Sequence, residues 1–207
     1  ELVKQLVAKL LPVPGTDINM SRTELTVGEW KMYLKAEGYP DYKPPSKDWG
    51  QTDDHPVVMV SWNWAKGLCV WLSSVTGKEW RLPTNAEWEA AVGPSTYPWG
   101  DEFPPKWDDG NYMILEGVKN DPKKVGVDGI LGTAPVGSFK PNRLGLYDLG
   151  GNVSEWMWDG RDESNGNPVT RGAGWDFPSE NLRTSFRGNK MGRDVFRPGT
   201  GIRLVRK

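Results

Sequence analysis

The alternation of hydrophobic and polar residues in the first half of the chain predicts three helices, and the first follows Thr26. Thr-Val-Gly-Glu at 26–29 matches a capping box, in which the Thr hydroxyl and the Glu carboxylate each accept a backbone N–H at the helix start. Trp30, Tyr33 and Leu34 then recur at the spacing of one helical face. The pattern stops at Gly38, so we expect the helix to end there.

Two further helices are predicted downstream. One begins at Ser61, a residue type that caps helix N-termini, and ends at Gly77, which suits the left-handed position after a helix. The other follows Thr84, which opens a second capping box, and ends at Gly93, with Trp88 facing inward. Seven apolar residues are expected to form the inner face of the helix after Ser61: Trp64, Ala65, Leu68, Cys69, Trp71, Leu72 and Val75.

The remaining segments show no helical period. Residues 40–56 are polar and rich in Pro, which predicts a loop, and the apolar run Val57–Val60 predicts a short strand. After Pro94 a Gly or Pro recurs every few residues, so we expect short strands and long ordered loops, with 201–205 as a closing strand. Loops of this length are uncommon unless they are functional or held by ions, aromatic packing or ion pairs.

Composition supports one loop-rich domain with an aromatic core. The 207 residues include 12 Trp, 25 Gly and 17 Pro, and they contain no fixed-period repeat or linker. Each buried Trp contributes about 150–250 Å² of surface, so these residues supply much of a core that is short of regular structure. We therefore expect residues 1–207 to form a single domain.

Net charge and the length of apolar runs argue against two classes of protein. A net charge of −1 argues against a general nucleic-acid binder, and no apolar run approaches the roughly 20 residues of a membrane-spanning helix. Residues 161–207 nevertheless hold ten Lys or Arg and five Asp or Glu, so they carry +5 and the rest carries −6. Either an anionic partner or internal pairing with acidic residues would explain this basic part.

The sequence lacks the residues of several kinds of active site. It contains one Cys and one His, too few for a structural zinc site, a Ser-His-Asp triad or a two-His iron site. Cys69 lies on a predicted apolar helix face, so we expect a core thiol rather than a nucleophile. His55 precedes Pro56 at the start of an apolar run, and a structural role is expected for it as well.

Two segments are rich in potential oxygen ligands. Asp148 and Glu155 flank a Gly-Gly turn, and Ca²⁺ prefers carboxylate and carbonyl oxygens at about 2.3–2.6 Å. A second stretch combines Asn111 and Tyr112 with Asp128, which lies in a common Asp-Gly turn. The residue types leave an alternative open, in which the carboxylates accept backbone N–H groups or pair with Arg.

The segment from Trp175 to Thr200 follows neither strand nor helix periodicity. Its aromatic residues alternate with Gly, Arg and Pro, a composition typical of rigid binding loops. The residues alone do not separate such a binding face from the irregular core of a loop-rich fold.

Seven motifs, in register from about residue 24 to 205, resemble the formylglycine-generating-enzyme (sulfatase-modifying factor) family. They are His55–Trp62, Arg81–Glu89, Tyr97–Gly100, Gly132–Val136, Gly151–Trp156, Arg171–Trp175 and Gly201–Val205. The resemblance implies an α+β, C-type-lectin-like fold with few helices, small twisted antiparallel sheets and much ordered coil.

The same resemblance implies two structural Ca²⁺ sites. The loop between the two halves of the first site is longer than in the enzymes. The implied ligands are Asn111, Tyr112, Asp128 and Ile130 at the first site, and Asp148, Gly151, Val153 and Glu155 at the second.

The chain departs from the family's enzymes at their reactive cysteines. Formylglycine-generating enzymes carry a redox-active Cys pair in the segment that matches Trp175–Arg187, and this chain has no Cys there. Copper then lacks its thiolate ligands, and one His is too few for the iron of the related sulfoxide synthases. We therefore expect neither copper nor iron, and no catalysis.

A non-catalytic branch of this fold, the variable proteins of diversity-generating retroelements, is similar in the same C-terminal segment. There Asn codons are mutated to NNY codons, which never encode Lys, Met, Trp, Glu or Gln. Nine residues are compatible with such codons, and we expect them to face solvent as a ligand-binding patch: Asp176, Phe177, Pro178, Phe186, Gly188, Val195, Phe196, Pro198 and Thr200.

The resemblance thus implies a surface-displayed variable protein that binds an unidentified ligand, either a protein or another cell-surface molecule. The chain starts at Glu1 without Met, which would suit a lipid anchor upstream of that residue. Two alternatives stay open: a homologue with a fixed binding or structural role in the cell envelope, and a metal-dependent oxidase.

Overall fold

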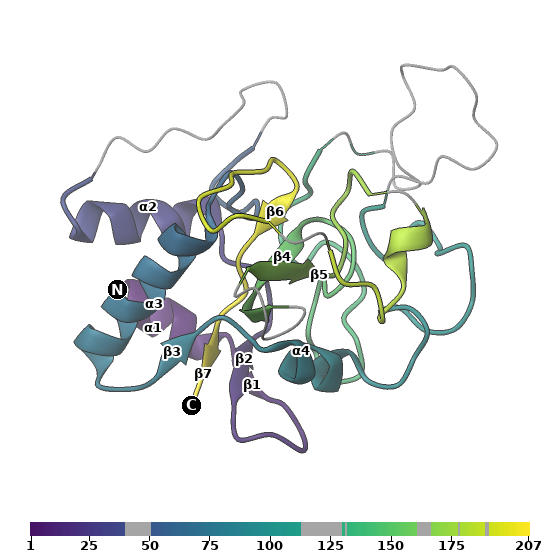
Figure 1. The fold of residues 1–207 in the computed structure, drawn as a ribbon, viewed down its shortest axis with the longest axis horizontal. Helices are drawn as coiled ribbons and strands as arrows, with labels where there is room; N and C mark the ends of the chain where they lie inside the picture. The colour runs from purple at the N-terminus through teal and green to yellow at the C-terminus, as the bar shows by residue number, and fades with distance from the viewer. Residues whose placement is uncertain (40–50, 113–129, 131, 161–166, 178, 189–190) are drawn as a thin grey trace.

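The structure is a computed structural model that describes the chain except for residues 40–50, 113–129, 131, 161–166, 178 and 189–190. Figure 1 shows three helices grouped on one side of the molecule, while much of the chain after the fourth helix runs through loops on the other side. The helices are α1 (Leu2–Ala8), α2 (Val27–Ala36), α3 (Trp62–Thr76) and α4 (Asn85–Val92), and a 3₁₀ turn, η1, spans Ser179–Leu182.

The strands form two small sheets. The first has the order β1-β2-β7-β3 and is antiparallel, and the second has the order β5-β4-β6, in which β4 and β6 are parallel. This arrangement of few helices, small sheets and much coil confirms the expected α+β class. The strands are β1 (Leu10–Pro12), β2 (Asn19–Ser21), β3 (Trp80–Arg81), β4 (Ser154–Gly160), β5 (Pro168–Arg171), β6 (Thr200–Gly201) and β7 (Val205–Arg206).

The three predicted helices are confirmed, together with their caps. The capping box of α2 is complete, since Glu29 N–H donates to the Thr26 hydroxyl at 3.2 Å and Thr26 N–H donates to the Glu29 carboxylate at 2.9 Å. The Ser61 hydroxyl accepts from the backbone near the start of α3, and Gly77 ends that helix with φ of 64°. Each cap satisfies backbone groups that the helix itself cannot, worth about 0.5–2 kcal/mol.

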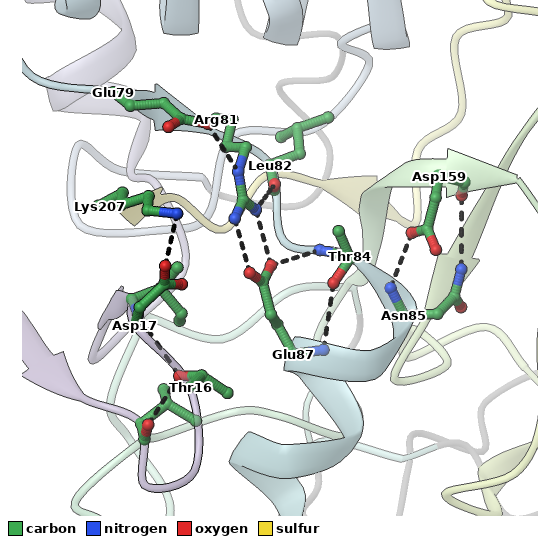
Figure 2. Close-up of polar contacts among 12 residues, drawn as sticks. Thr16, Asp17, Glu79, Arg81, Leu82, Thr84, Asn85, Glu87, Asp159 and Lys207 are labelled. Carbon is green, nitrogen blue, oxygen red and sulfur yellow. Dashed lines mark hydrogen bonds and ion pairs between the residues drawn. The ribbon is translucent and has the colours of Figure 1, made fainter.

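The start of α4 is tied to both sheets, as Figure 2 shows. Arg81 on β3 donates two hydrogen bonds of 2.6 Å to Glu87, the carboxylate that also completes the capping box with Thr84. Asn85 N–H donates to the Asp159 carboxylate on β4 at 2.7 Å. These contacts fix α4 against the sheets and so give the loops after it a rigid base.

The expected Trp-rich core is present. One cluster of buried apolar residues joins α1, α2 and α3 to Trp80 and Trp156, and a second surrounds Trp88 between α4 and the sheets. Three of the largest fully buried side chains are Trp30, Trp88 and Trp156. No helix within the described residues is long and apolar enough to span a membrane.

The inner face of α3 is narrower than predicted. Ala65, Leu68, Cys69 and Leu72 are buried, but Trp64 and Val75 are 47% and 52% exposed. Residues 64 and 75 lie at the margins of the apolar stripe, where exposure depends on which other segments cover the helix. The prediction that these two side chains face the core is therefore wrong.

Two predicted strands take other forms. Val57 and Val60 are fully buried but form no strand, because Met59 between them has a left-handed φ of 53° that breaks the extended backbone. The closing strand at 201–205 divides into β6, which pairs with β4, and β7, which pairs with β2 and β3. The predicted strand at 201–205 is therefore shared between the two sheets.

Candidate functional site

The loop formed by residues 192–198, here called the tip loop, is held mainly through its backbone. Met59 N–H donates to the Arg197 carbonyl at 3.0 Å, and Asn63 N–H donates to the Arg193 carbonyl at 3.1 Å. A third backbone bond, from Val195 N–H to Gly192, closes the turn at 3.1 Å. Because backbone groups are the same in every residue except Pro, these bonds do not depend on which side chains the loop carries.

The side chains at the end of the tip loop face solvent. Val195 is 37% exposed and Phe196 is 43% exposed, high values for apolar residues. The Phe196 ring meets Trp64 of α3 edge-on, with ring centroids 6.1 Å apart. Arg197 is exposed and Pro198 half-buried. These four residues form an accessible patch beside α3.

The preceding stretch, residues 173–177 and 179–188, here called the inner segment, is held by backbone bonds and, in addition, by its side chains. Thr184 N–H donates to the Thr96 carbonyl and Gly188 N–H to the Thr170 carbonyl, each at 2.9 Å. Phe177 packs on a buried cluster that contains Tyr97, Tyr112 and Leu182. The Phe186 ring lies 6.2 Å from that of Phe177 in a T-shaped arrangement. Both Phe rings are partly buried, so they contribute to packing as well as to the surface.

Two residues of the predicted patch are buried, contrary to the expectation that all nine face solvent. Gly188 lies against β5, where a Cβ added to it would come within 2.2 Å of the Thr170 hydroxyl. Thr200 is 1% exposed, because it belongs to β6 and its hydroxyl is 3.0 Å from that of Ser154. Pro178 lies outside the described residues.

Asp176 belongs to the inner segment, and its side chain reaches Gly199, directly after the tip loop. The residue as a whole is exposed, but its carboxylate lies so close to Gly199 that a Cβ there would be 2.3 Å from Oδ1. Burial of this carboxylate raises the pKa of Asp176, and the charge of Arg197 lowers it by a smaller amount.

Arg171 anchors the inner segment, and the sequence analysis did not single it out as a functional residue. Its side chain is fully buried and donates to the Glu89 carboxylate at 2.6 Å, to the Thr184 carbonyl at 2.9 Å and to Asn85 at 3.2 Å. Its guanidinium also stacks on Trp88, 4.8 Å from the ring centroid. Burial raises the pKa of Glu89, but the hydrogen bonds and charges of Arg171 and Arg187 together lower that pKa below its ordinary value.

The predicted ligand Glu155 pairs with Arg. Its fully buried carboxylate accepts from Arg203 Nε at 2.7 Å and from Trp88 Nε1 at 3.0 Å. The Arg203 guanidinium also donates to the carbonyls of Ser21 and Tyr147, at 2.9 and 2.6 Å. For Glu155 the structure therefore shows the alternative given in the sequence analysis, in which the carboxylate pairs with Arg.

Asp148 differs from Glu155 in keeping one oxygen without a partner. Its Oδ2 accepts from Gly137 N–H at 2.7 Å, while its Oδ1 is buried and accepts no hydrogen bond from the residues that the structure describes. Burial raises the pKa of Asp148. The residue also lines a cavity of about 400 Å³ together with Tyr112 and Arg143. An unpartnered buried carboxylate oxygen is a suitable ligand for a cation.

A third buried carboxylate, Glu24, lies close by and was missed by the sequence analysis. It accepts from Asn152 Nδ2 at 2.8 Å and from Val153 N–H at 3.2 Å. Burial, with a further contribution from the charge of Asp148, raises the pKa of Glu24 well above its ordinary range. No local signal indicated this role, because the partners of Glu24 lie more than 120 residues away along the chain.

The predicted calcium ligands form no cluster of three Asp, Glu, His or Cys residues suited to a metal within the described part of the chain. Gly151 and Val153 are buried in the turn between Asp148 and Glu155. Asn111 uses its side-chain amide to donate to the Gly132 carbonyl at 2.8 Å. Tyr112 is buried, Ile130 is half-buried, and Asp128 lies outside the described residues.

The single Cys and the single His both have structural positions, as predicted. Cys69 is 1% exposed on the inner face of α3, and burial raises the pKa of its thiol to about 12. His55 is buried, with Nδ1 3.0 Å from the Thr133 hydroxyl, and burial lowers its pKa. A thiol with this pKa is protonated at neutral pH and is a poor nucleophile or metal ligand.

A family model, "Sulfatase-modifying factor enzyme 1-like domain", matches residues 13–207. The formylglycine-generating enzyme of Mus musculus is 37% identical over 134 residues, which cover 63% of this chain and 34% of that protein. The "Inactive C-alpha-formylglycine-generating enzyme 2" of Bos taurus is 41% identical over 130 residues, or 59% of this chain and 39% of that protein. The matched segment therefore spans little more than a third of these curated relatives.

Solved structures show the same fold over almost the whole chain. PvdO from Pseudomonas aeruginosa has a TM-score of 0.73 and 28% identity, and the match covers 92% of this chain and 80% of that one. Treponema denticola variable protein 1 also has a TM-score of 0.73, with 21% identity and coverage of 91% and 84%. At 21% identity the second likeness establishes the fold and nothing further.

Proposed function

The chain belongs to the sulfatase-modifying factor enzyme 1-like domain family, and on that premise we propose that it is a non-catalytic ligand-binding protein. In this proposal its C-terminal residues are diversified by a retroelement and displayed outside the cytoplasm. The ligand is a protein or another cell-surface molecule.

One observation carries the proposal: the tip loop keeps its position through backbone bonds to Met59 and Asn63, while Val195 and Phe196 face solvent. Substitution of these side chains would change the surface that a ligand meets without removing the bonds that hold the loop. A preformed loop also loses little conformational entropy when it binds.

The chemistry of the chain supports binding over catalysis. The segment that matches the reactive cysteines of the enzymes contains no Cys, and the single thiol, Cys69, is buried with a raised pKa. Family membership alone does not decide this point, because the relatives include enzymes and a protein named inactive. Incubation with a Cys-containing peptide and copper or iron tests the alternative directly, and oxidation of the peptide would overturn the proposal.

Sequencing of the encoding locus is the decisive test. We expect a near-identical template repeat and a reverse-transcriptase gene nearby, and sister genes that differ mostly at codons for exposed residues such as Val195 and Phe196. Differences spread evenly along the chain would reject diversification and would favour a fixed partner or a structural role in the envelope.

The display role requires an extracytoplasmic position, which we propose together with a lipid anchor attached upstream of the chain. Protease treatment of intact cells that express the full-length protein tests this. Cleavage within the tip loop without cell lysis is expected, and full protection would contradict surface display.

We also propose a structural Ca²⁺ at Asp148, because its buried Oδ1 has no hydrogen-bond partner. The Gly151 and Val153 carbonyls are the further ligands expected in the same turn, whereas Glu155 would first have to release Arg203 or Trp88. Calcium is expected to raise the melting temperature relative to a chelator, and Asp148→Asn should abolish the difference. Equal melting temperatures with and without calcium would reject the site.

A further inference from the structure

The accessible surface continues from the tip loop onto α3. Trp64 is nearly half exposed, and its ring stacks on that of the fully buried Trp30, with centroids 6.2 Å apart and planes at 23°. The edge-on contact with Phe196 places an exposed residue of the tip loop next to this indole. An exposed Trp held from below by another Trp is a rigid apolar contact, the kind of residue that dominates binding energy at interfaces.

A groove of about 560 Å³ runs beside α3, between that helix and α2. Its lining includes Tyr33, Glu37, Asn63, Lys66, Val70 and Trp71. Asn63 also belongs to the tip-loop contacts, because its side-chain amide donates to Asp194 at 2.7 Å. The groove and the tip loop therefore meet at Asn63 and form one continuous surface.

The cationic groups on this surface are held in place by aromatic rings. Lys66 Nζ lies 5.4 Å from the ring centroid of Trp62 and 5.7 Å from that of Trp158. The Arg193 guanidinium lies 4.9 Å from the same Trp62 ring. Of these two rings Trp62 is buried and Trp158 is exposed. Positioned cations at the edge of an apolar surface complement a partner that presents carboxylates around an apolar side chain.

We propose that Trp64 and the groove along α3 form a fixed half of the binding face and take an acidic protein segment. An apolar side chain of that segment lies against Trp64 or in the groove, and its carboxylates meet Lys66 and Arg193. Val195 and Phe196 of the tip loop supply the variable half, whereas Arg193 of the same loop is not among the nine predicted variable positions and belongs to the fixed half. This inference rests on the proposed function and adds the class of ligand and a contact residue outside the diversified segment.

The test is a selection of random peptides, displayed on phage, against the whole purified protein. We expect the selected peptides to be acidic with at least one aromatic or large aliphatic residue, and to bind less tightly as salt is raised. Trp64→Ala and, independently, Lys66→Glu should each weaken binding about tenfold or more.

Matched controls separate a contact role from loss of folding. Trp107→Ala removes an indole that is 68% exposed on a separate loop, and Lys78→Glu reverses an exposed charge beyond the end of α3. Both controls should keep full affinity, and all four variants should retain the circular dichroism spectrum of the parent. Lys66→Glu keeps the test valid if Trp64→Ala proves unstable.

Several outcomes would overturn the inference. They are peptides without an acidic bias, unchanged affinity in both test variants, failure to select any peptide, self-association of the protein through this face, or binding of a glycan array in place of peptides. The proposed function fails separately: if Val195→Ala and Phe196→Ala leave the affinity of every selected peptide unchanged, the variable half is wrong, whatever Trp64 does.

Discussion

The tip loop and the inner segment are neighbours in the chain and both make backbone hydrogen bonds to other segments, but they differ in how far their apolar side chains are buried. The tip loop is fixed by backbone bonds such as Met59 to Arg197, and its apolar side chains face solvent. The inner segment has backbone bonds as well, such as Gly188 N–H to the Thr170 carbonyl, but side chains add to them, with Phe177 packed against a buried cluster and Arg171 donating to the Thr184 carbonyl. Seven of the nine predicted variable positions lie in these two stretches and therefore fall into two groups with different tolerance to substitution.

The difference has a physical basis. A backbone hydrogen bond survives most substitutions, whereas a packed ring or a buried ion pair is lost with its side chain. Diversification of a binding face without unfolding is consequently easiest at residues 195–197. The following predictions test this contrast, in order of expected effect.

Loss of Arg171 should have the largest effect. Arg171→Met removes the hydrogen bonds that Arg171 donates to Glu89, the Thr184 carbonyl and Asn85, and should lower the free energy of unfolding by about 2–4 kcal/mol. The upper limit is reduced because Glu89 is partly exposed and is solvated when its partner is lost. Urea unfolding measures the change, with Arg197→Met as the control, expected within about 0.5 kcal/mol. Equal effects of the two changes would contradict the contrast.

A methyl group at Gly188 should have the next largest effect. Gly188→Ala places a Cβ about 2.2 Å from the Thr170 hydroxyl and should cost about 1–3 kcal/mol of stability through overpacking. The matched change Gly192→Ala in the tip loop meets only Val195, at 3.5 Å, and should be nearly neutral. Thermal denaturation compares them, and Thr170→Ala should restore part of the loss at Gly188. A neutral Gly188→Ala would place that position among the tolerant ones.

Replacement of Phe177 and of Phe196 should change the free energy of unfolding by amounts that differ less than in the two predictions above. Phe177→Ala removes a ring that packs on the buried cluster of Tyr97 and Tyr112, and should cost about 1–2 kcal/mol, less than a fully buried Phe would. Phe196→Ala removes an exposed ring and should stay within about 0.5 kcal/mol. Chemical denaturation of the two variants side by side decides the matter, and a costlier Phe196→Ala would reverse our assignment of the two stretches.

The smallest effect concerns Asp176, whose carboxylate connects the two stretches. Its pKa is raised by burial, so the folded protein binds this proton more tightly than the unfolded chain, and the stability it contributes is lost as pH rises through the folded pKa. Asp176→Asn should therefore be more stable than the parent at neutral pH, with the difference vanishing near pH 3, below the ordinary Asp pKa of about 3.9. Melting temperatures of both proteins across this range measure it, and a constant difference would show that the carboxylate does not titrate with folding.

The sequence predicted the fold class and the helices α2, α3 and α4, because their signals are local, but it did not predict α1, which has no side-chain cap at its start. The residues that cap α2, α3 and α4 lie within three positions of the groups they bind. Seven motifs in register were enough to indicate the family, and the core positions of Cys69 and His55 followed from their apolar surroundings.

The binding face was predicted only in part. The composition of residues 175–200 indicated rigid loops with aromatic residues, but it could not separate exposed Phe196 from partly buried Phe177 or buried Thr200. That distinction depends on which distant segments cover each residue. Trp64 was assigned to the core for the same reason, since it lies at the margin of the apolar stripe of α3, where exposure depends on how far other segments, here the tip loop, cover it.

The sequence by itself determined where helices begin and end, how much aromatic surface was available for a core, and that reactive cysteines are missing. Only the tertiary structure decided that 201–205 divides between two sheets, that Arg203 occupies the Glu155 carboxylate, and that Glu24 joins Asp148 in the interior. The reason is range: a capping bond joins residues three apart, whereas Arg203 and Glu155 are 48 apart and Glu24 and Asn152 are 128 apart. Pairings at such separations are set by how the whole chain packs, and no local pattern encodes them.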